Sequence, residues 1–262
     1  MRVRLRFSKL GKIRFTGQRD VARMWERALR RDGFPVAYSA GFSPRPQLSF
    51  GLALPTGAES LAEYLDVTVD PGRGTGVDLD ETPARLSALL PEGIEVTAAA
   101  ALAEGDASLQ EIVTTCRWVL ALGGATGDQV ASVLAAALAA DHLPVVRRRK
   151  GRDTEDDLRP SILALEAGGV GPDGTVDMVA ELATRPRGVR PAELMAALAT
   201  AGRPNAGPVP TVGNNLGGPV LLRACRTNQW IECDGSRRDP LPEREGAGGA
   251  PHHTAFASGR AS

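Results

Sequence analysis

Arginine side chains near the start of the chain are the residues whose type and spacing are best suited to chemistry. A guanidinium fork matches the oxygens of a phosphate group and also stacks on a base. The first fifty residues hold twelve Lys and Arg residues against three acidic residues, a net charge of +9 (12 − 3), whereas the whole chain balances 31 basic residues against 31 acidic ones. Charge gathered at one end of a neutral protein predicts a surface for a polyanion. The residues predicted to contact nucleic acid are Arg19, Arg23, Arg27, Arg30, Arg31, Arg45, Phe42 and Lys150.

Aromatic residues and a second basic run refine this prediction. Arg45 lies close in the sequence to Phe42 and Tyr38, and aromatic rings beside cationic side chains are typical of surfaces on which unpaired bases stack. The alternative is that these arginines only form solvated faces. The second basic run, Arg147–Arg152, is followed directly by an acidic run over residues 153–157. It is either a solvated, self-neutralising loop or a finger that contacts phosphates.

The other reactive side chains predict no catalytic or metal site. A zinc or iron–sulfur site needs closely spaced thiolates, but Cys116, Cys225 and Cys233 are widely separated. We expect His142 to cap a helix or to lie at the surface, and the adjacent histidines 252 and 253 fall in the C-terminal tail. The sequence contains no nucleophile elbow, phosphate-binding loop or HExxH motif. We therefore expect no cofactor and no catalytic residue in this chain.

A predicted helix over residues 19–31 must position most of the arginines. At about 100° per residue, Arg23, Arg27 and Arg30 fall on the side opposite an apolar stripe, and Gly33 is expected to end the helix. The stripe consists of Val21, Trp25, Ala28 and Leu29. An acidic residue in the first turn favours the positive end of the helix dipole. Structural rather than binding roles are therefore expected for Asp20 and, in the following loop, for Gly41, Pro44 and Pro46.

The order of elements predicts an α+β fold of two tandem ferredoxin-like βαββαβ domains, with antiparallel sheets and helices on one face. The first domain, residues 1–105, has expected strands at 2–7, 48–54, 61–69 and 94–96 and helices at 19–31 and 83–90, the second of them capped by Thr82. The second, residues 110–232, has expected strands at 114–122, 161–166, 175–184 and 220–226 and helices at 127–140, capped by Thr126, and 191–201. Residues 143–160 then form a long excursion, and the tail, residues 233–262, is predicted to be disordered.

The first strand raises a geometric conflict. Arg2, Arg4 and Arg6 alternate with apolar residues, which is typical of a strand with one cationic face. In a two-layer domain that face lies opposite the outer side of the helix, so the two cannot touch one short ligand. We expect the strand arginines to line the junction with the second domain, and the helix and the Gly41–Pro46 loop to be the functional surface.

The sequence also bears on the compartment. No stretch approaches the roughly 20 apolar residues of a membrane helix, and the basic N-terminus leads into no apolar segment, so neither a membrane span nor a signal peptide is predicted. Three scattered cysteines favour a reducing environment. The expected location is the cytoplasm.

Several strings in the chain resemble a known family, the radical SAM-linked (radical SAM-associated) bacterial domains of unknown function. The resemblance is specific over about residues 1–70 and continues more weakly through residues 150–151, 157–160 and 226–230. The strings that carry it are Arg14-Phe-Thr-Gly-Gln-Arg-Asp20, Glu26-Arg-Ala-Leu-Arg-Arg31, Pro35-Val-Ala-Tyr-Ser-Ala-Gly-Phe-Ser-Pro-Arg-Pro46 and Leu54-Pro-Thr-Gly57.

The resemblance implies an accessory role, because domains of that family are fused to, or encoded with, a B12-type radical SAM protein. A 4Fe-4S cluster and S-adenosylmethionine are then expected only in that partner, since this chain lacks the Cys-x3-Cys-x2-Cys motif that would hold them. Relatives usually have Ser-His where this chain has Gly17-Gln18. If that histidine does chemistry in relatives, this chain lacks it, and a binding role gains weight.

Three functions follow from these observations. The first is a non-catalytic subunit that recruits an RNA substrate, a tRNA or rRNA, to a radical SAM system. The second is a docking module that binds the radical SAM partner without touching RNA. The third, an RNA-processing endonuclease, is weakened because no histidine accompanies the basic surface.

Overall fold

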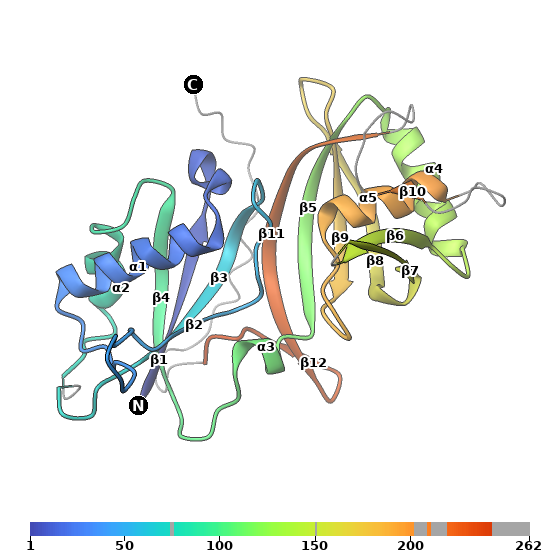
Figure 1. The fold of residues 1–262 in the computed structure, drawn as a ribbon. Helices are drawn as coiled ribbons and strands as arrows, with labels where there is room; N and C mark the ends of the chain where they lie inside the picture. The colour runs from blue at the N-terminus through green and yellow to red at the C-terminus, as the bar shows by residue number, and fades with distance from the viewer. Residues whose placement is uncertain (74–75, 150, 202–208, 211–218, 243–262) are drawn as a thin grey trace.

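One mixed sheet forms the centre of the fold. The computed structural model describes residues 1–73, 76–149, 151–201, 209–210 and 219–242. Within them nine strands make up the sheet: β1 (Arg2–Lys9), β2 (Leu48–Phe50), β3 (Glu59–Thr68), β4 (Ile94–Leu102), β5 (Thr115–Gly123), β8 (Ile162–Val170), β9 (Val176–Ala183), β11 (Val220–Cys233) and β12 (Ser236–Arg238). Seven strands follow one another in the order β4-β1-β3-β11-β5-β9-β8, while β2 pairs with β3 and β12 with β11 (Figure 1).

The N-terminal half contains the elements that the sequence predicts, with altered bounds. Helix α1 (Gln18–Asp32) packs its apolar stripe on β1, where the Trp25 and Phe7 rings meet edge to face with centroids 5.0 Å apart. Gly33 ends the helix at φ +74°, a backbone conformation that glycine adopts without a Cβ penalty. The expected strand 48–54 shortens to β2, whereas the expected strand 94–96 lengthens to β4. These strands differ from the prediction in their lengths, whereas the order of the predicted elements is unchanged.

The second helix begins one residue earlier than expected. Helix α2 spans Thr82–Ser87 and its N-cap is Glu81, so the prediction of Thr82 as the N-cap is wrong. The reason is local, because the Thr82 N–H and hydroxyl both donate to the carbonyl of Asp78 and draw Thr82 into the first turn. Pro83 still lies in that first turn, where its missing N–H costs nothing.

The C-terminal half contains the predicted elements in the predicted order, together with several short elements that were not predicted. It contains α3 (Leu109–Ile112), α4 (Gly127–Ala139), α5 (Pro191–Thr200) and the strands β6 (Pro144–Arg149), β7 (Arg152–Asp157) and β10 (Val209–Pro210). Thr126 caps α4, as predicted, by accepting from the Gln129 N–H. The expected excursion over residues 143–160 is an ordered hairpin of β6 and β7, which with β10 forms a separate three-stranded sheet. Two short 3-10 helices, η1 (Gly11–Phe15) and η2 (Arg159–Ser161), complete the described elements.

The two halves share the central sheet, which differs from the expected pair of antiparallel sheets. Strand β11 runs parallel to β3 and antiparallel to β5, so the last long strand joins the first half to the second. Strand β3 pairs with β2 through its residues 65–67 and with β11 through its residues 59–60. The fold is therefore an α+β protein with one large mixed sheet.

Apolar cores lie on both faces of this sheet. One core lies between α1, α2 and the strands β1, β3 and β4, and a second lies among α4, α5 and the strands β5, β8 and β9. On the opposite face, Leu109 of α3 packs on Ala62 and Tyr64 of β3. Leu241 completes this small third core.

The start of the C-terminal tail is ordered, contrary to the prediction of disorder from residue 233. Residues 236–238 form β12, and Asp239, Pro240 and Leu241 contact β1 and β3. We call residues 239–241 the C-terminal strap. The rest of the predicted tail, with His252 and His253, lies outside the described residues.

Candidate nucleic-acid interface

The outer side of α1 is an exposed row of arginines. The amphipathic pattern buries Val21, Trp25, Ala28 and Leu29 and leaves the charged residues in solvent. All five helix arginines predicted to bind nucleic acid are exposed: Arg19, Arg23, Arg27, Arg30 and Arg31. At a rise of about 1.5 Å per residue, the row extends over about 20 Å of the helix. We call these five residues the arginine row.

Contacts within the row leave its charge accessible. Arg23 pairs with Asp20 at 3.2 Å, but the Arg23 side chain remains 71% exposed and an exposed i,i+3 pair adds little stability. Asp20 lies in the first turn of α1, consistent with the structural role expected for it. At the other end of the helix, Asp32 accepts two hydrogen bonds from Arg85 of α2, at 3.0 and 2.6 Å, and this pairing fixes α1 against α2.

The loop that follows α1 is an ordered hairpin. Ala37 and Ser39 pair with Gln47 and Arg45, where the Ser39 N–H donates to the Arg45 carbonyl at 2.8 Å and the Arg45 N–H donates to Ser39 Oγ at 3.0 Å. The Ala37 N–H also donates to the Thr68 carbonyl of β3 at 2.8 Å. We call residues 37–47 the Phe42 finger.

The sequence-predicted residues of this hairpin lie at or next to its tip. Phe42 is fully exposed, and Arg45 is also exposed. Gly41 has a φ of +130°, which explains the need for glycine beside Phe42. Pro46 closes the finger through a β-bridge to Tyr38, and Pro44 lies exposed between the tip and Arg45. Lys150 lies outside the described residues.

A further exposed aromatic ring, Phe15, precedes the helix and was not among the predicted site residues. The guanidinium carbon of Arg14 lies over the Phe15 ring, 4.7 Å from its centroid, and Phe15 is 64% exposed. Arg14 is in turn bound by the buried carboxylate of Glu59 at 3.1 Å. The sequence signal was the Arg14-Phe15 dipeptide just before an arginine-rich helix.

The arginines of β1 are not a free surface, and their expected position at the junction with a second domain is wrong. Arg4 is 2% exposed and forms two hydrogen bonds with the Asp66 carboxylate, at 2.6 and 2.8 Å. It also donates to the Pro240 carbonyl at 2.7 Å, and Arg6 pairs with Asp239 at 3.3 Å. On this face of β1, the C-terminal strap contacts Arg4 and Arg6, whereas Arg2 contacts Asp66 and the Asp106 carbonyl.

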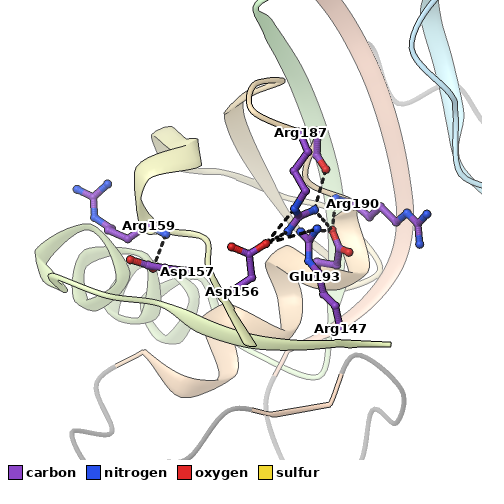
Figure 2. Close-up of polar contacts among 8 residues, drawn as sticks. Arg147, Asp156, Asp157, Arg159, Arg187, Arg190 and Glu193 are labelled. Carbon is purple, nitrogen blue, oxygen red and sulfur yellow. Dashed lines mark hydrogen bonds and ion pairs between the residues drawn. The ribbon is translucent and has the colours of Figure 1, made fainter. Parts of the chain in front are cut away.

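The second basic run takes part in an internal ion-pair network (Figure 2). Arg147 of β6 pairs with Glu193 at 3.0 Å and with Asp156 at 3.7 Å, and Arg187 contacts the same two carboxylates at 3.5 and 2.8 Å. Glu193 also accepts from the Arg190 N–H at 2.9 Å. The network fixes the start of α5 against the β6–β7 hairpin, so the Arg147 guanidinium is used within the fold. Sequence reasoning missed Arg187 and Glu193. Glu193 is the third residue of α5, which begins at Pro191, and a glutamate at that position is a capping signal.

A buried ion pair joins the two halves of the sheet. Arg226 of β11 donates to the Glu63 carboxylate of β3 at 2.6 Å and to the Leu52 carbonyl at 2.8 Å, and it lies 5.5 Å from the Trp118 ring centroid. Burial raises the pKa of Cys225 to about 12 and also raises the pKa of Cys116. Both thiols are thus protonated at neutral pH, as a structural role requires.

The remaining polar groups form no metal-ligating cluster in the part of the chain that the structure describes. No group of three His, Cys, Asp or Glu residues there is arranged to hold a metal ion. His142 Nδ1 lies 2.9 Å from the Asp157 carboxylate, and the hydrogen bond to this acceptor raises the pKa of the exposed imidazole. Among the described helices, none has the length and apolar character to span a membrane.

Comparison with known proteins identifies a family. No curated protein matches the chain. A solved structure titled "Crystal Structure of a Cbf5-Nop10-Gar1 Complex" aligns with 87% of this chain at 9% identity and a TM-score of 0.46. The alignment covers 48% of that chain, so this chain spans about half its length, and a likeness this distant transfers no function. The family described as "Uncharacterized protein conserved in bacteria (DUF2344)" matches residues 2–191, and the chain belongs to that family.

Proposed function

We propose that this protein is a non-catalytic RNA-binding subunit, which presents a tRNA or rRNA to a B12-type radical SAM protein. The observation that carries the proposal is the arginine row, five guanidinium groups exposed along one side of a single rigid helix. Arginines in such a row can each meet a phosphate oxygen with two N–H donors. A helix also holds their spacing fixed, so that binding orders little except the side chains.

The size and charge of the row fit a nucleic-acid backbone. Its length of about 20 Å spans several phosphates, since a duplex carries one charge per about 1.7 Å of its axis. Helix α1 has three acidic residues against the five arginines of the row. Asp20 pairs with Arg23, Asp32 pairs with Arg85 of α2, and Glu26 is exposed. The field over this helix is therefore positive although the chain is neutral.

The proposal assigns the chemistry to the partner protein. Gln18, in place of the histidine that relatives usually carry, is an exposed residue at the start of α1, where it has no acid–base function. The 4Fe-4S cluster and S-adenosylmethionine belong, in this proposal, to the radical SAM protein. This chain binds the RNA, and the cytoplasm is the compartment in which this chain and the radical SAM protein would act.

The salt dependence of RNA affinity tests the RNA part of the proposal. The logarithm of the association constant should fall linearly with the logarithm of salt concentration. Replacing Arg23 and Arg27 together with alanine should weaken binding uniformly across sequences and flatten that slope by about one unit for each lost phosphate contact. Fluorescence anisotropy with labelled tRNA over a salt series measures both quantities.

The matched control is Arg190→Ala with Arg238→Ala, which removes two exposed arginines outside the arginine row. This variant has the same net charge as the test variant and should keep the slope of the unaltered protein. Absent or salt-independent binding would contradict RNA recognition. Co-purification with a radical SAM protein without retained RNA would favour the docking module instead.

A further inference from the structure

The rings of Phe15 and Phe42 are exposed and belong to no apolar core; Phe15 packs against the Arg14 guanidinium, and Phe42 is carried by a hairpin whose backbone is paired. We infer that they are stacking platforms for unpaired bases at the two ends of the arginine row, so that the RNA bound here is single-stranded along α1. This inference rests on the proposed function and narrows it from RNA in general to an unpaired segment.

Phe15 is supported by a chain of contacts that ends at a buried carboxylate. The Arg14 guanidinium covers one face of the ring at 4.7 Å, and Glu59 binds that guanidinium at 3.1 Å. Glu59 itself is 6% exposed, accepts the Gly11 N–H at 2.9 Å and belongs to β3, where β11 pairs with it. The ring is therefore connected to the central sheet through two side chains, and this support lowers the ordering cost of stacking a base on its exposed face.

An aromatic ring in that state suits a base better than a protein side chain. A base stacks on a ring through its π-face, which every base has, and a guanidinium under the ring adds a cation–π contribution. An exposed apolar ring next to a row of five arginines is also a poor site for an apolar protein surface, because docking would bury those charges. The charge around Phe15 therefore favours a polyanion that carries flat apolar groups, which is the chemistry of single-stranded RNA.

Phe42 provides the second platform at the other end of the helix. Its finger is fixed by the Ser39–Arg45 backbone pairing and by the hydrogen bond from Ala37 to Thr68 of β3. The ring at the tip is fully exposed, and the guanidinium of Arg45 lies three residues away. Helix η1 ends at Phe15 and adjoins the start of α1. The segment that leads to the Phe42 finger follows the other end of α1 (Figure 1). The arginine row thus lies between the two rings along the chain.

This arrangement discriminates against a duplex. Bases inside a duplex are stacked on one another and present only their edges, so neither ring could reach a π-face. Along an unpaired strand, the arginines can follow the phosphates while a base near each end stacks on a ring. Each stacked base is worth roughly tenfold in affinity.

The test compares two probes on four proteins. The probes are a labelled single-stranded RNA of about twelve nucleotides, within the range of known single-strand site sizes, and the same strand annealed to its complement. The proteins are the unaltered full chain, Phe15→Ala/Phe42→Ala, Arg23→Ala/Arg27→Ala, and the control Leu163→Ala, which removes an exposed apolar side chain from β8. All altered side chains are exposed, and circular dichroism should show an unchanged fold.

We expect the unaltered protein to prefer the single strand by at least about tenfold. The double phenylalanine variant should lose that preference while its duplex affinity is unchanged, and Leu163→Ala should behave as the unaltered protein. Phe15→Trp should retain the preference, because a larger ring keeps the stack. Equal affinity for both probes, or a preference that survives loss of both rings, would overturn the inference.

The two proposals fail in distinguishable ways. If the arginine variant loses affinity for both probes and the unaltered protein shows no preference, the RNA-binding function stands and the stacking inference is wrong. If no probe binds, or the arginine variant binds as the unaltered protein does, the proposed function fails and the inference falls with it. If the phenylalanine variant loses a co-purifying protein but no RNA affinity, the rings are a protein contact.

Discussion

Two ion pairs in this protein show how far the environment of a residue decides its contribution. The Arg226–Glu63 pair has side chains 2% and 10% exposed, whereas the Arg23–Asp20 pair has side chains 71% and 58% exposed. Water competes for the exposed pair and leaves it worth little, but a buried guanidinium that loses its carboxylate has no solvent to turn to. An arginine–carboxylate pair can thus contribute to stability where it is buried and leave its guanidinium accessible where it is exposed.

Loss of one partner of the buried pair should be costly. Arg226→Ala leaves the Glu63 carboxylate buried without its guanidinium partner, and we expect a loss of about 3–5 kcal/mol in the free energy of unfolding. Urea denaturation followed by tryptophan fluorescence measures this change. Arg23→Ala is the control, with an expected change of about 0–1 kcal/mol. If Arg226→Ala costs no more than Arg23→Ala, the pair is not the buried contact described above.

At the residue scale, the sequence predicted local burial well and distant pairing poorly. The 3.6-residue period identified Val21, Trp25, Ala28 and Leu29 as buried, because a helix face depends only on neighbours in the sequence. The period of two placed Arg4 on a cationic strand face expected at the junction with a second domain. Instead Arg4 is buried by Asp66 and Pro240, which are 62 and 236 residues away in the sequence. No local pattern carries that information.

At the scale of elements, α1 is both the scaffold of the arginine row and a well-bounded helix. Its end is set by Gly33, whose N–H donates to the Arg30 carbonyl while the φ of +74° turns the chain toward Phe34. Phe34 and Val36 then enter the core beside Leu29. The direction of the finger therefore depends on this one glycine.

Gly33→Ala should strain the helix end. A Cβ meets no atom within 4 Å there, so the penalty is conformational, and we expect about 1–2 kcal/mol of destabilisation. Thermal unfolding measures it. Gly169→Ala is the matched control, since Gly169 of β8 has neither a positive φ nor an atom within 4 Å of the added Cβ, and its variant should lose no stability. Equal effects of the two substitutions would contradict the left-handed cap.

The two strands of the β6–β7 hairpin were not predicted from the sequence. Strands β6 and β7 are rich in charged residues and lack the apolar alternation that identifies a half-buried strand. They pair because Arg147 finds Glu193 and Asp156, and because the Asp157 carboxylate accepts the N–H groups of Leu143 and Arg159. Such partners become visible only once the fold is known.

At the scale of the whole molecule, the C-terminal strap closes the face of the sheet opposite α1. Asp239 accepts from the Tyr64 hydroxyl at 2.8 Å and pairs with Arg6, while Leu241 packs on Ala62 and Tyr64. Burial, followed by the charge of Asp239, raises the pKa of Tyr64 well above its usual value. The strap therefore keeps a neutral tyrosine and a buried arginine satisfied at once.

Asp239→Ala should destabilise the protein by about 1–3 kcal/mol, because the Tyr64 hydroxyl and Arg6 lose their acceptor in a largely buried setting. Denaturant unfolding of the full chain measures the change. Glu155→Ala, which removes an exposed carboxylate from β7, is expected to stay within about 0.5 kcal/mol of the unaltered protein. RNA affinity should be the same in both variants, since the strap lies on the face opposite the arginine row.

The parallel pairing of β3 with β11 has a consequence for how the protein is made. Residues 59–60 pair with residues 225–226, so the central sheet cannot be completed until nearly the whole described chain has left the ribosome. Pairings so distant in sequence are slow to form. The helix that carries the arginine row is complete long before then, beside a strand edge that is still open. A growing chain of this protein is thus cationic at its front and has an open strand edge at residues 59–60 of β3, because β2 covers that edge only at residues 65–67. During this period unwanted pairing with another chain is most favoured.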